Sequence, residues 1–181
     1  MEPTREIYWN ISGETWLYVF LLAALGVLAY GVYRRVRLWG LGGEVQRLDR
    51  LGERVRVLLV EVFGQRRPLR DRYPGIAHLL LFYGFLALVV ATALISLQDW
   101  TGAHFLKGSF YLWYSLLSDV FGLLALVGLG MLLWRRAVVR PERLHSVLDD
   151  WIVLGLLLLI FLQGFLVEGV RIALTELQQQ P

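Results

Sequence analysis

Residues 75–97 read GIAHLLLFYGFLALVVATALISL, and this stretch decides the fold. It contains no acidic residue, no lysine and no arginine over a length close to the roughly 20 residues that an α-helix needs to cross a bilayer. In lipid the backbone polar groups find no water, and a helix pairs them all within one segment. The stretch therefore predicts a transmembrane helix.

Three further apolar stretches accompany it, at about residues 15–33, 111–134 and 151–173. The whole chain of 181 residues is 57% hydrophobic, and its mean hydropathy is +0.56, which is too apolar for a soluble domain of this size. We predict an all-α integral membrane protein: one membrane domain over residues 1–181, built as a bundle of four transmembrane helices. Because the chain has no cysteine, it cannot itself ligate an iron–sulfur cluster through thiolates.

The cationic residues predict an orientation. Arginine supplies all of them except Lys107, and 15 of the 18 lie in segments 34–74 and 135–150. By the positive-inside rule both segments are cytoplasmic loops, which puts both termini outside. The net charge is only +3, so nucleic acid is not an expected partner.

The longer of these loops contains a helical pattern at about residues 44–63. Its apolar residues recur every three or four positions, and its arginines fall on the other face. The apolar set is Val45, Leu48, Leu51, Val55, Leu58, Leu59 and Val62. We predict an amphipathic helix at the cytoplasmic membrane surface or against a partner, where arginine suits anionic headgroups. A solvated connector is the alternative.

Two histidines share the Arg-rich side, and a neutral imidazole is a good axial ligand for haem iron. His78 lies in the second apolar stretch, and His145 precedes the fourth, where Asp149 at i, i+4 could orient its ring. Arg70 and Arg72 could pair with haem propionates. Two simpler interpretations stay open: His78 hydrogen-bonds a neighbouring helix, and His145 is a solvated loop residue.

The surroundings of His78 favour the haem interpretation. Phe82 and Phe85 lie near its helical face, where aromatic rings can pack flat against a macrocycle. Gly75 and Gly84 are expected to leave room for it. The glycines of VGLGMLL and GFLVEG, in contrast, are interpreted as helix-packing positions.

A second polar set lies in the half of the membrane away from the arginines. Asp119 is in the third apolar stretch, and Glu168 is in the fourth, three residues before Arg171. Carboxylates at this depth are costly unless they are paired or used. One hypothesis is proton handling by Asp119 and Glu168 at an outward-facing quinol site. The other is an ion pair between Glu168 and Arg171 that fixes packing.

Three runs suggest a family: RDRYPGIAHLLLFYGFLALV, HFLKGSFYLWYSLLSDVFGLLALVGLGMLLWRR and DDWIVLGLLLLIFLQGFLVEGVRIA. Together they resemble the cytochrome b membrane domain of the respiratory nitrate reductase gamma-subunit type, as found with heterodisulfide-reductase-like iron–sulfur oxidoreductases. The resemblance implies a b-type cytochrome subunit of a prokaryotic inner membrane. Such a subunit transfers electrons between the quinone pool and an iron–sulfur partner on the cytoplasmic side. His78 matches the family's histidine that ligates the cytoplasmic-side haem.

Two departures from the family shape the expectation. Its diheme members have another histidine about three turns further along the second helix, where this chain has Leu88, Val89 and Val90, so one haem b is expected. The family also has a fifth helix that supplies the partner histidines, and this sequence ends at Pro181 before any such helix. The second ligand is then expected from a longer chain, from another subunit or from His145.

The resemblance leaves a second function open, a haem-free membrane anchor that holds a redox partner and shapes a quinone pocket. A small transporter ranks third. Transporters favour helices broken by glycine or proline and internal repeats. None of the four apolar stretches contains a proline, and the sequence shows no repeat.

Overall fold

The computed structural model describes residues 4–5, 7, 15–42, 49–142, 144 and 147–175. Across these residues the chain is nearly all helical, and the only β pairing is an isolated antiparallel bridge between Thr4 and Lys107. Contacts divide the chain into two units, residues 8–57 and residues 1–7 with 58–181. Each unit is described by itself.

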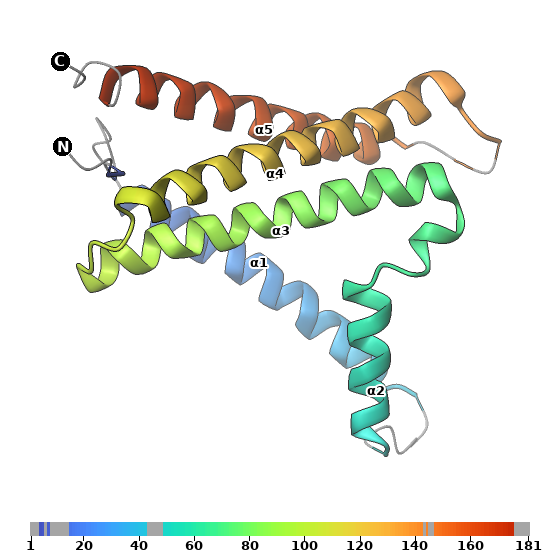
Figure 1. The fold of residues 1–181 in the computed structure, drawn as a ribbon. Coiled ribbons are helices and arrows are strands. Elements are labelled where there is room, and N and C mark those ends of the chain that lie inside the picture. Colours follow the sequence, from blue (N-terminus) through green and yellow to red (C-terminus); the bar gives the residue numbers. More distant parts are fainter. Residues whose placement is uncertain are drawn as a thin grey trace. The chain divides into compact units, whose positions relative to one another are not determined.

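Four helices are long and apolar enough to cross a membrane: α1 (Thr15–Trp39), α3 (Arg72–Thr101), α4 (Gly108–Trp134) and α5 (Leu148–Thr175) (Figure 1). The four predicted helices and the all-α membrane fold are therefore confirmed. Every helix runs beyond its apolar window. For example, α1 continues past Tyr33 through Arg34, Arg35 and Arg37, since arginine is a good helix former whose stem can lie along apolar surface.

The predicted loop helix is described only in part. Helix α2 covers Leu51–Leu58, and a π-helical turn at Leu59–Phe63 follows it. Residues 43–48 lie outside the described residues, so Val45 and Leu48 of the predicted apolar stripe are not described. The position of this helix at a membrane surface stays a prediction.

In the larger unit, α3 and α4 pack closely through small residues. A Cβ on Gly84 would lie 2.5 Å from the Cβ of Ala125, and one on Gly128 would lie 2.5 Å from the carbonyl oxygen of Ala77. Ala77 and Ala125 are fully buried. Small side chains let two backbones approach and gain dispersion contacts where no hydrophobic effect drives helices together.

This packing corrects the expectation that glycines leave room for a macrocycle beside His78. Gly84 faces α4, and Gly75 faces the short 3₁₀ helix η2 (Pro68–Arg70), where a Cβ would lie 2.4 Å from the carbonyl oxygen of Pro68. Among the predicted packing glycines, Gly128 is confirmed. Gly130, Gly164 and Gly169 instead have open space where a Cβ would stand.

Helix α4 lies between α3 and α5 in the larger unit (Figure 1). Its far side packs on α5 around Leu129 and Phe161, both of which are buried. The described backbones of α3 and α5 do not approach each other closely. Side chains from all three helices line one pocket.

Gly84→Ala should destabilise the protein, whereas Gly155→Ala should not. The first adds a methyl group against Ala125 and the backbone of Phe121, and overpacking of this kind costs about 1–3 kcal/mol. At Gly155 the Cβ meets nothing within 4 Å, so the helix should gain from the lost flexibility of glycine. Thermal unfolding in detergent measures both, and equal midpoints would refute the close α3–α4 contact.

Candidate functional site

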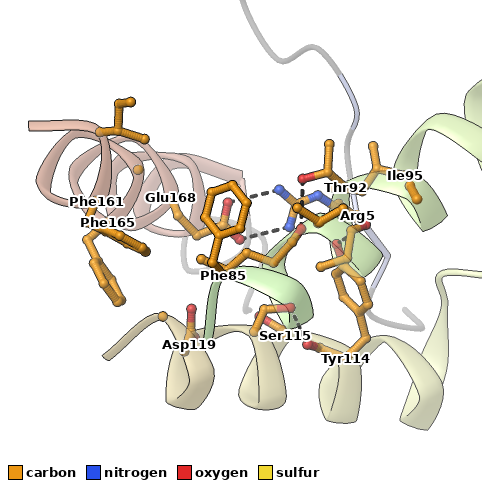
Figure 2. Close-up of a pocket in the computed structure, with 18 of the residues that line it drawn as sticks. Arg5, Phe85, Thr92, Ile95, Tyr114, Ser115, Asp119, Phe161, Phe165 and Glu168 are labelled. Atoms are coloured by element: carbon orange, nitrogen blue, oxygen red, sulfur yellow. Dashed lines mark hydrogen bonds and ion pairs between the residues drawn. The ribbon is translucent and has the colours of Figure 1, made fainter. Parts of the chain in front are cut away.

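A cavity of about 700 Å³ lies among α3, α4 and α5, and Arg5 from the N-terminal segment also lines it (Figure 2). Most of its wall is apolar, and its size is typical of a pocket for a small molecule. The larger apolar side chains of the wall are Phe85, Leu88, Val89, Ile95, Leu157, Ile160, Phe161 and Phe165.

The polar end of the cavity is built around the Glu168 carboxylate. Arg5 approaches it as a fork, with Nη1 2.9 Å from Oε1 and Nη2 3.0 Å from Oε2. Arg171 donates to the same carboxylate through Nη2 to Oε1 at 2.8 Å and through Nε to Oε2 at 3.1 Å. Two guanidinium groups thus share one carboxylate. The predicted i, i+3 pair of Glu168 and Arg171 is present, and Arg5 adds a partner from far away in the sequence.

Arg171 connects this cluster to α4. Its side chain is only 6% exposed, and its Nη2 donates to the Tyr111 hydroxyl at 2.9 Å. The Thr175 hydroxyl, one turn along α5, donates to the Arg171 carbonyl oxygen at 2.8 Å. Since Tyr111 is 1% exposed, the network ties the buried start of α4 to the last turns of α5.

Asp119 lies on α4 in the wall of the same cavity, one turn after Ser115 (Figure 2). Ser118, the residue directly before Asp119, also lines the cavity. Among the described residues its carboxylate has no hydrogen bond or ion pair. Arg5 and Glu168 line the same cavity. The cavity therefore holds two carboxylates in different settings, one clamped and one without a direct partner.

His78 lies on the face of α3 that continues into the cavity wall. Its ring stacks on that of Phe82, with centroids 6.2 Å apart and planes 12° apart. Residues 78, 82, 85 and 89 follow helical spacing, and Phe85 and Val89 line the cavity. From His78 to Phe85 is seven residues, about 10 Å along the helix at the usual rise. The imidazole is exposed rather than packed on a neighbouring helix.

Of the other predicted haem-side residues, the structure describes Arg70 and Arg72. Arg70 ends η2 and Arg72 begins α3, and both are exposed. His145 lies outside the described residues, and α5 begins just after it at Leu148. No described set of three or more His, Cys, Asp or Glu side chains could hold a metal ion. One imidazole, His78, is thus the described candidate for a haem ligand on this side.

The sequence profile of the nitrate reductase gamma subunit family matches residues 69–179, which include α3, α4 and α5. The chain belongs to this family. The predicted resemblance is confirmed, and the matched region contains His78, Asp119, Glu168 and Arg171. Arg5 lies outside it.

Three similar proteins have the names of oxidoreductases or of a reductase subunit. The chain is 36% identical over 94% of its length to an EtfAB:quinone oxidoreductase of Syntrophomonas wolfei, of which it covers 24%. It is 30% identical over 65% of its length to a subunit of the dihydromethanophenazine:CoB–CoM heterodisulfide reductase of Methanosarcina thermophila, covering 47%. It is 29% identical over 78% of its length to a probable iron-sulfur-binding oxidoreductase, FadF, of Bacillus subtilis, covering 22%. The chain thus spans less than half of each relative, and no solved structure matches it.

Sequence reasoning identified Asp119, Glu168 and Arg171 but missed Arg5 as part of their cluster. The available signal was weak: Arg5 is one of three cationic residues outside the two Arg-rich segments. Its partner is 163 positions away, so no local spacing pointed to the contact.

Glu168→Gln should lower the free energy of unfolding by about 3 kcal/mol, because it removes the carboxylate that the buried Arg171 guanidinium contacts through two nitrogens. Glu53→Gln is the matched control. Glu53 is 66% exposed and lies 3.8 Å from Arg50, and exposed pairs of this kind contribute about 0–1 kcal/mol. Denaturant titration in micelles measures both variants. Equal effects would mean that the Glu168 cluster is not a stabilising element.

Proposed function

We propose that this chain is a membrane electron-transfer component of a quinone-linked oxidoreductase complex, and that the cavity among α3, α4 and α5 binds the quinone. The cavity itself carries the proposal, since it joins aromatic and aliphatic walls to a charged end. A quinone needs this combination: an apolar site for its ring and tail, and donors for its oxygens. The name of the Syntrophomonas relative, an EtfAB:quinone oxidoreductase, supports the substrate class.

Quinol oxidation releases two electrons and two protons, so the site needs a proton acceptor beside the hydroxyl groups. Asp119 and Glu168 are the carboxylates that line the cavity. A general base must lie within hydrogen-bond reach of the proton that it takes, and it needs an oxygen that is not already accepting from another donor. Asp119 has such oxygens. Glu168 accepts from Arg5 and Arg171, and this polar end can orient the quinone oxygen.

The family implies haem b, and the described residues fit it in part. The exposed His78 imidazole, stacked on Phe82, would hold the iron from one side, and Arg70 and Arg72 would pair with the propionates. A second ligand would come from His145 or from protein outside the described residues. Haem, when bound, supplies one-electron chemistry. Position 78 would put it on the same face of α3 as the quinone cavity.

The haem-free membrane anchor is the second candidate. It is favoured by the presence of a single described imidazole on the Arg-rich side. In this function the chain still shapes the quinone cavity, but electrons pass directly between the quinone and clusters of the partner.

The Arg-rich end of the larger unit is proposed as the cytoplasmic side, with both termini outside. Ion pairs order part of this end: Arg136 lies 2.7 Å from Asp150, and Arg135 lies 3.5 Å from Asp71. Other arginines there, such as Arg66 and Arg72, are exposed. An iron–sulfur partner would dock here. The name of the Bacillus relative, a probable iron-sulfur-binding oxidoreductase, supports this class of partner.

Protein purified from haem-replete cells should give a reduced-minus-oxidised b-type spectrum that His78→Ala abolishes. His104→Ala should keep the spectrum, because His104 lies after α3 and its Nδ1 contacts the Gly102 carbonyl oxygen. Optical spectra at equal protein concentration make the comparison. A colourless but folded wild-type protein would favour the anchor, and a spectrum that survives His78→Ala would remove His78 as a ligand.

Gly164→Phe should weaken binding of a short-chain quinone analogue at least about tenfold, equivalent to 1.4 kcal/mol. Gly164 lines the cavity, and a Cβ there meets only open space, so the added ring would take the volume of the ligand. Gly155→Phe is the control, because Gly155 is an open position on the same helix that does not line this cavity. Titration by quenching of tryptophan fluorescence measures both. Equal affinities would place the quinone elsewhere.

A further inference from the structure

A quinone oxygen needs a hydrogen-bond donor, and few side chains of the cavity lining still have one to give. We propose that Arg5 is the donor that binds the ligand's oxygen, so that the cavity selects a ring that carries an acceptor oxygen. The inference rests on the proposed function for its ligand. It adds to the site a residue from outside the family region, residues 69–179.

The lining contains a limited set of donors. Its described side chains with an N–H or O–H group are Arg5, Thr92, Ser96, Tyr114, Ser115 and Ser118. The other described lining residues are apolar, apart from Asp119 and Glu168, whose carboxylates accept hydrogen bonds when ionised. A hydroxyl has one hydrogen, so a hydroxyl that donates to a backbone carbonyl oxygen has none left for a ligand. Following each hydroxyl to its acceptor therefore identifies the donors that a ligand can use.

On α3 both hydroxyls are already used. The Thr92 hydroxyl donates to the Leu88 carbonyl oxygen at 2.9 Å, one turn back along the helix. The Ser96 hydroxyl donates to the Thr92 carbonyl oxygen at 3.1 Å in the same way. The α3 wall can therefore accept a hydrogen bond from a ligand through these oxygens, but it has no hydroxyl hydrogen to donate.

On α4 two of the three hydroxyls are used as well. The Ser118 hydroxyl donates to the Tyr114 carbonyl oxygen at 2.8 Å. The Tyr114 hydroxyl donates across to α3, to the Ala91 carbonyl oxygen at 3.0 Å. Ser115 is the third, and its hydroxyl has no hydrogen-bond partner among the described residues. It is thus one donor of the lining that a ligand can use.

Arg5 is the other available donor, and it is the only cation among the described lining residues. A guanidinium has five N–H groups, and two of them bind the Glu168 carboxylate at 2.9 and 3.0 Å. The remaining three have no acceptor among the described residues. A hydrogen bond from a charged donor is stronger than one from a neutral hydroxyl, so Arg5 rather than Ser115 should dominate the recognition of an oxygen.

The fold holds this donor in place before a ligand arrives. The Arg5 N–H donates to the carbonyl oxygen of Leu106 at 3.4 Å, and the neighbouring Thr4 forms the bridge to Lys107. Leu106 is 2% exposed, and the Arg5 side chain is 17% exposed. The Glu168 fork fixes the guanidinium itself. A donor ordered in this way loses little freedom on binding, and this lowers the cost of association.

A pair of probes that differ only in their oxygens tests the inference. The quinone is 2-methyl-1,4-naphthoquinone, and the oxygen-free match is 2-methylnaphthalene. Equilibrium dialysis of the full chain in nanodiscs against empty nanodiscs measures the affinity of each probe. The wild type should prefer the quinone, and Arg5→Met should reduce that preference by about tenfold, the effect of losing one hydrogen bond from a charged donor. If Arg5→Met weakens both probes equally, Arg5 only shapes the cavity and the inference is wrong.

Three further variants separate donation from structure. Arg5→Lys keeps a charged donor without the fork and should retain part of the preference, whereas a structural role for the fork predicts that it behaves like Arg5→Met. Ser115→Ala should reduce the preference less than Arg5→Met does, because its donor is neutral. Ser118→Ala is the matched control, since its hydroxyl hydrogen is already used, and it should keep the preference. A preference that depends on Ser115 and not on Arg5 would overturn the proposal.

The carbonyl stretch of the bound quinone gives a direct readout. In the wild type, infrared spectra with empty nanodiscs subtracted should show a C=O band at lower frequency than in an apolar solvent, because a donor weakens the C=O bond. Arg5→Met should return the band towards its position in the solvent, and Ser118→Ala should leave it lowered. An unshifted band in the wild type would refute the inference even if Arg5→Met folds poorly.

The outcomes distinguish this inference from the proposed function. If the preference depends on Arg5 but membranes that contain the whole complex transfer no electrons to or from quinone, the proposed function fails and the recognition by Arg5 stands. If Gly164→Phe abolishes quinone binding while Arg5→Met keeps the full preference, the quinone cavity stands and the role of Arg5 fails. A wild type that binds neither probe would contradict both.

Discussion

The buried charge of Arg171 is the constraint on which the larger unit depends. A guanidinium cannot lose its proton in a protein, and this one is almost completely withdrawn from solvent near the end of a helix able to span a membrane. It therefore requires an anion and further acceptors nearby. Glu168, Tyr111 and Thr175 meet these needs, and their positions bring α5 against the start of α4. Since Glu168 can hold a second cation, the N-terminal segment joins the same structure through Arg5.

The α3–α4 contact depends on small side chains instead of charges. Its glycines and alanines bring the two backbones together, and no charge is involved. The α4–α5 contact is more open along its length and is closed at one end by the ionic cluster. A cavity forms where close packing on one side of α4 meets looser packing on the other. The same geometry explains why its walls are apolar and its charges gather at one end.

The helices could be predicted from sequence because crossing a bilayer imposes a length and a composition that a window of about 20 residues displays. The pair of Glu168 and Arg171 could be predicted as well, since i, i+3 spacing puts both side chains on one helix face. Arg5 could not, because no periodicity relates residues so far apart. Gly84 was misjudged for a related reason. Sequence shows that a glycine leaves space, but only the packed structure shows that the backbone of α4 fills it.

The family match and the N-terminal segment contribute differently to the candidate site. The matched region supplies every lining residue of the cavity except Arg5. His78 lies on one face of α3, and the cavity lies about two turns further along that face. Asp119 and Glu168 are the described carboxylates of the cavity lining. Arg5 adds a cation from outside the matched region, and it is held at both ends: its guanidinium binds Glu168, and its backbone N–H donates to the Leu106 carbonyl oxygen.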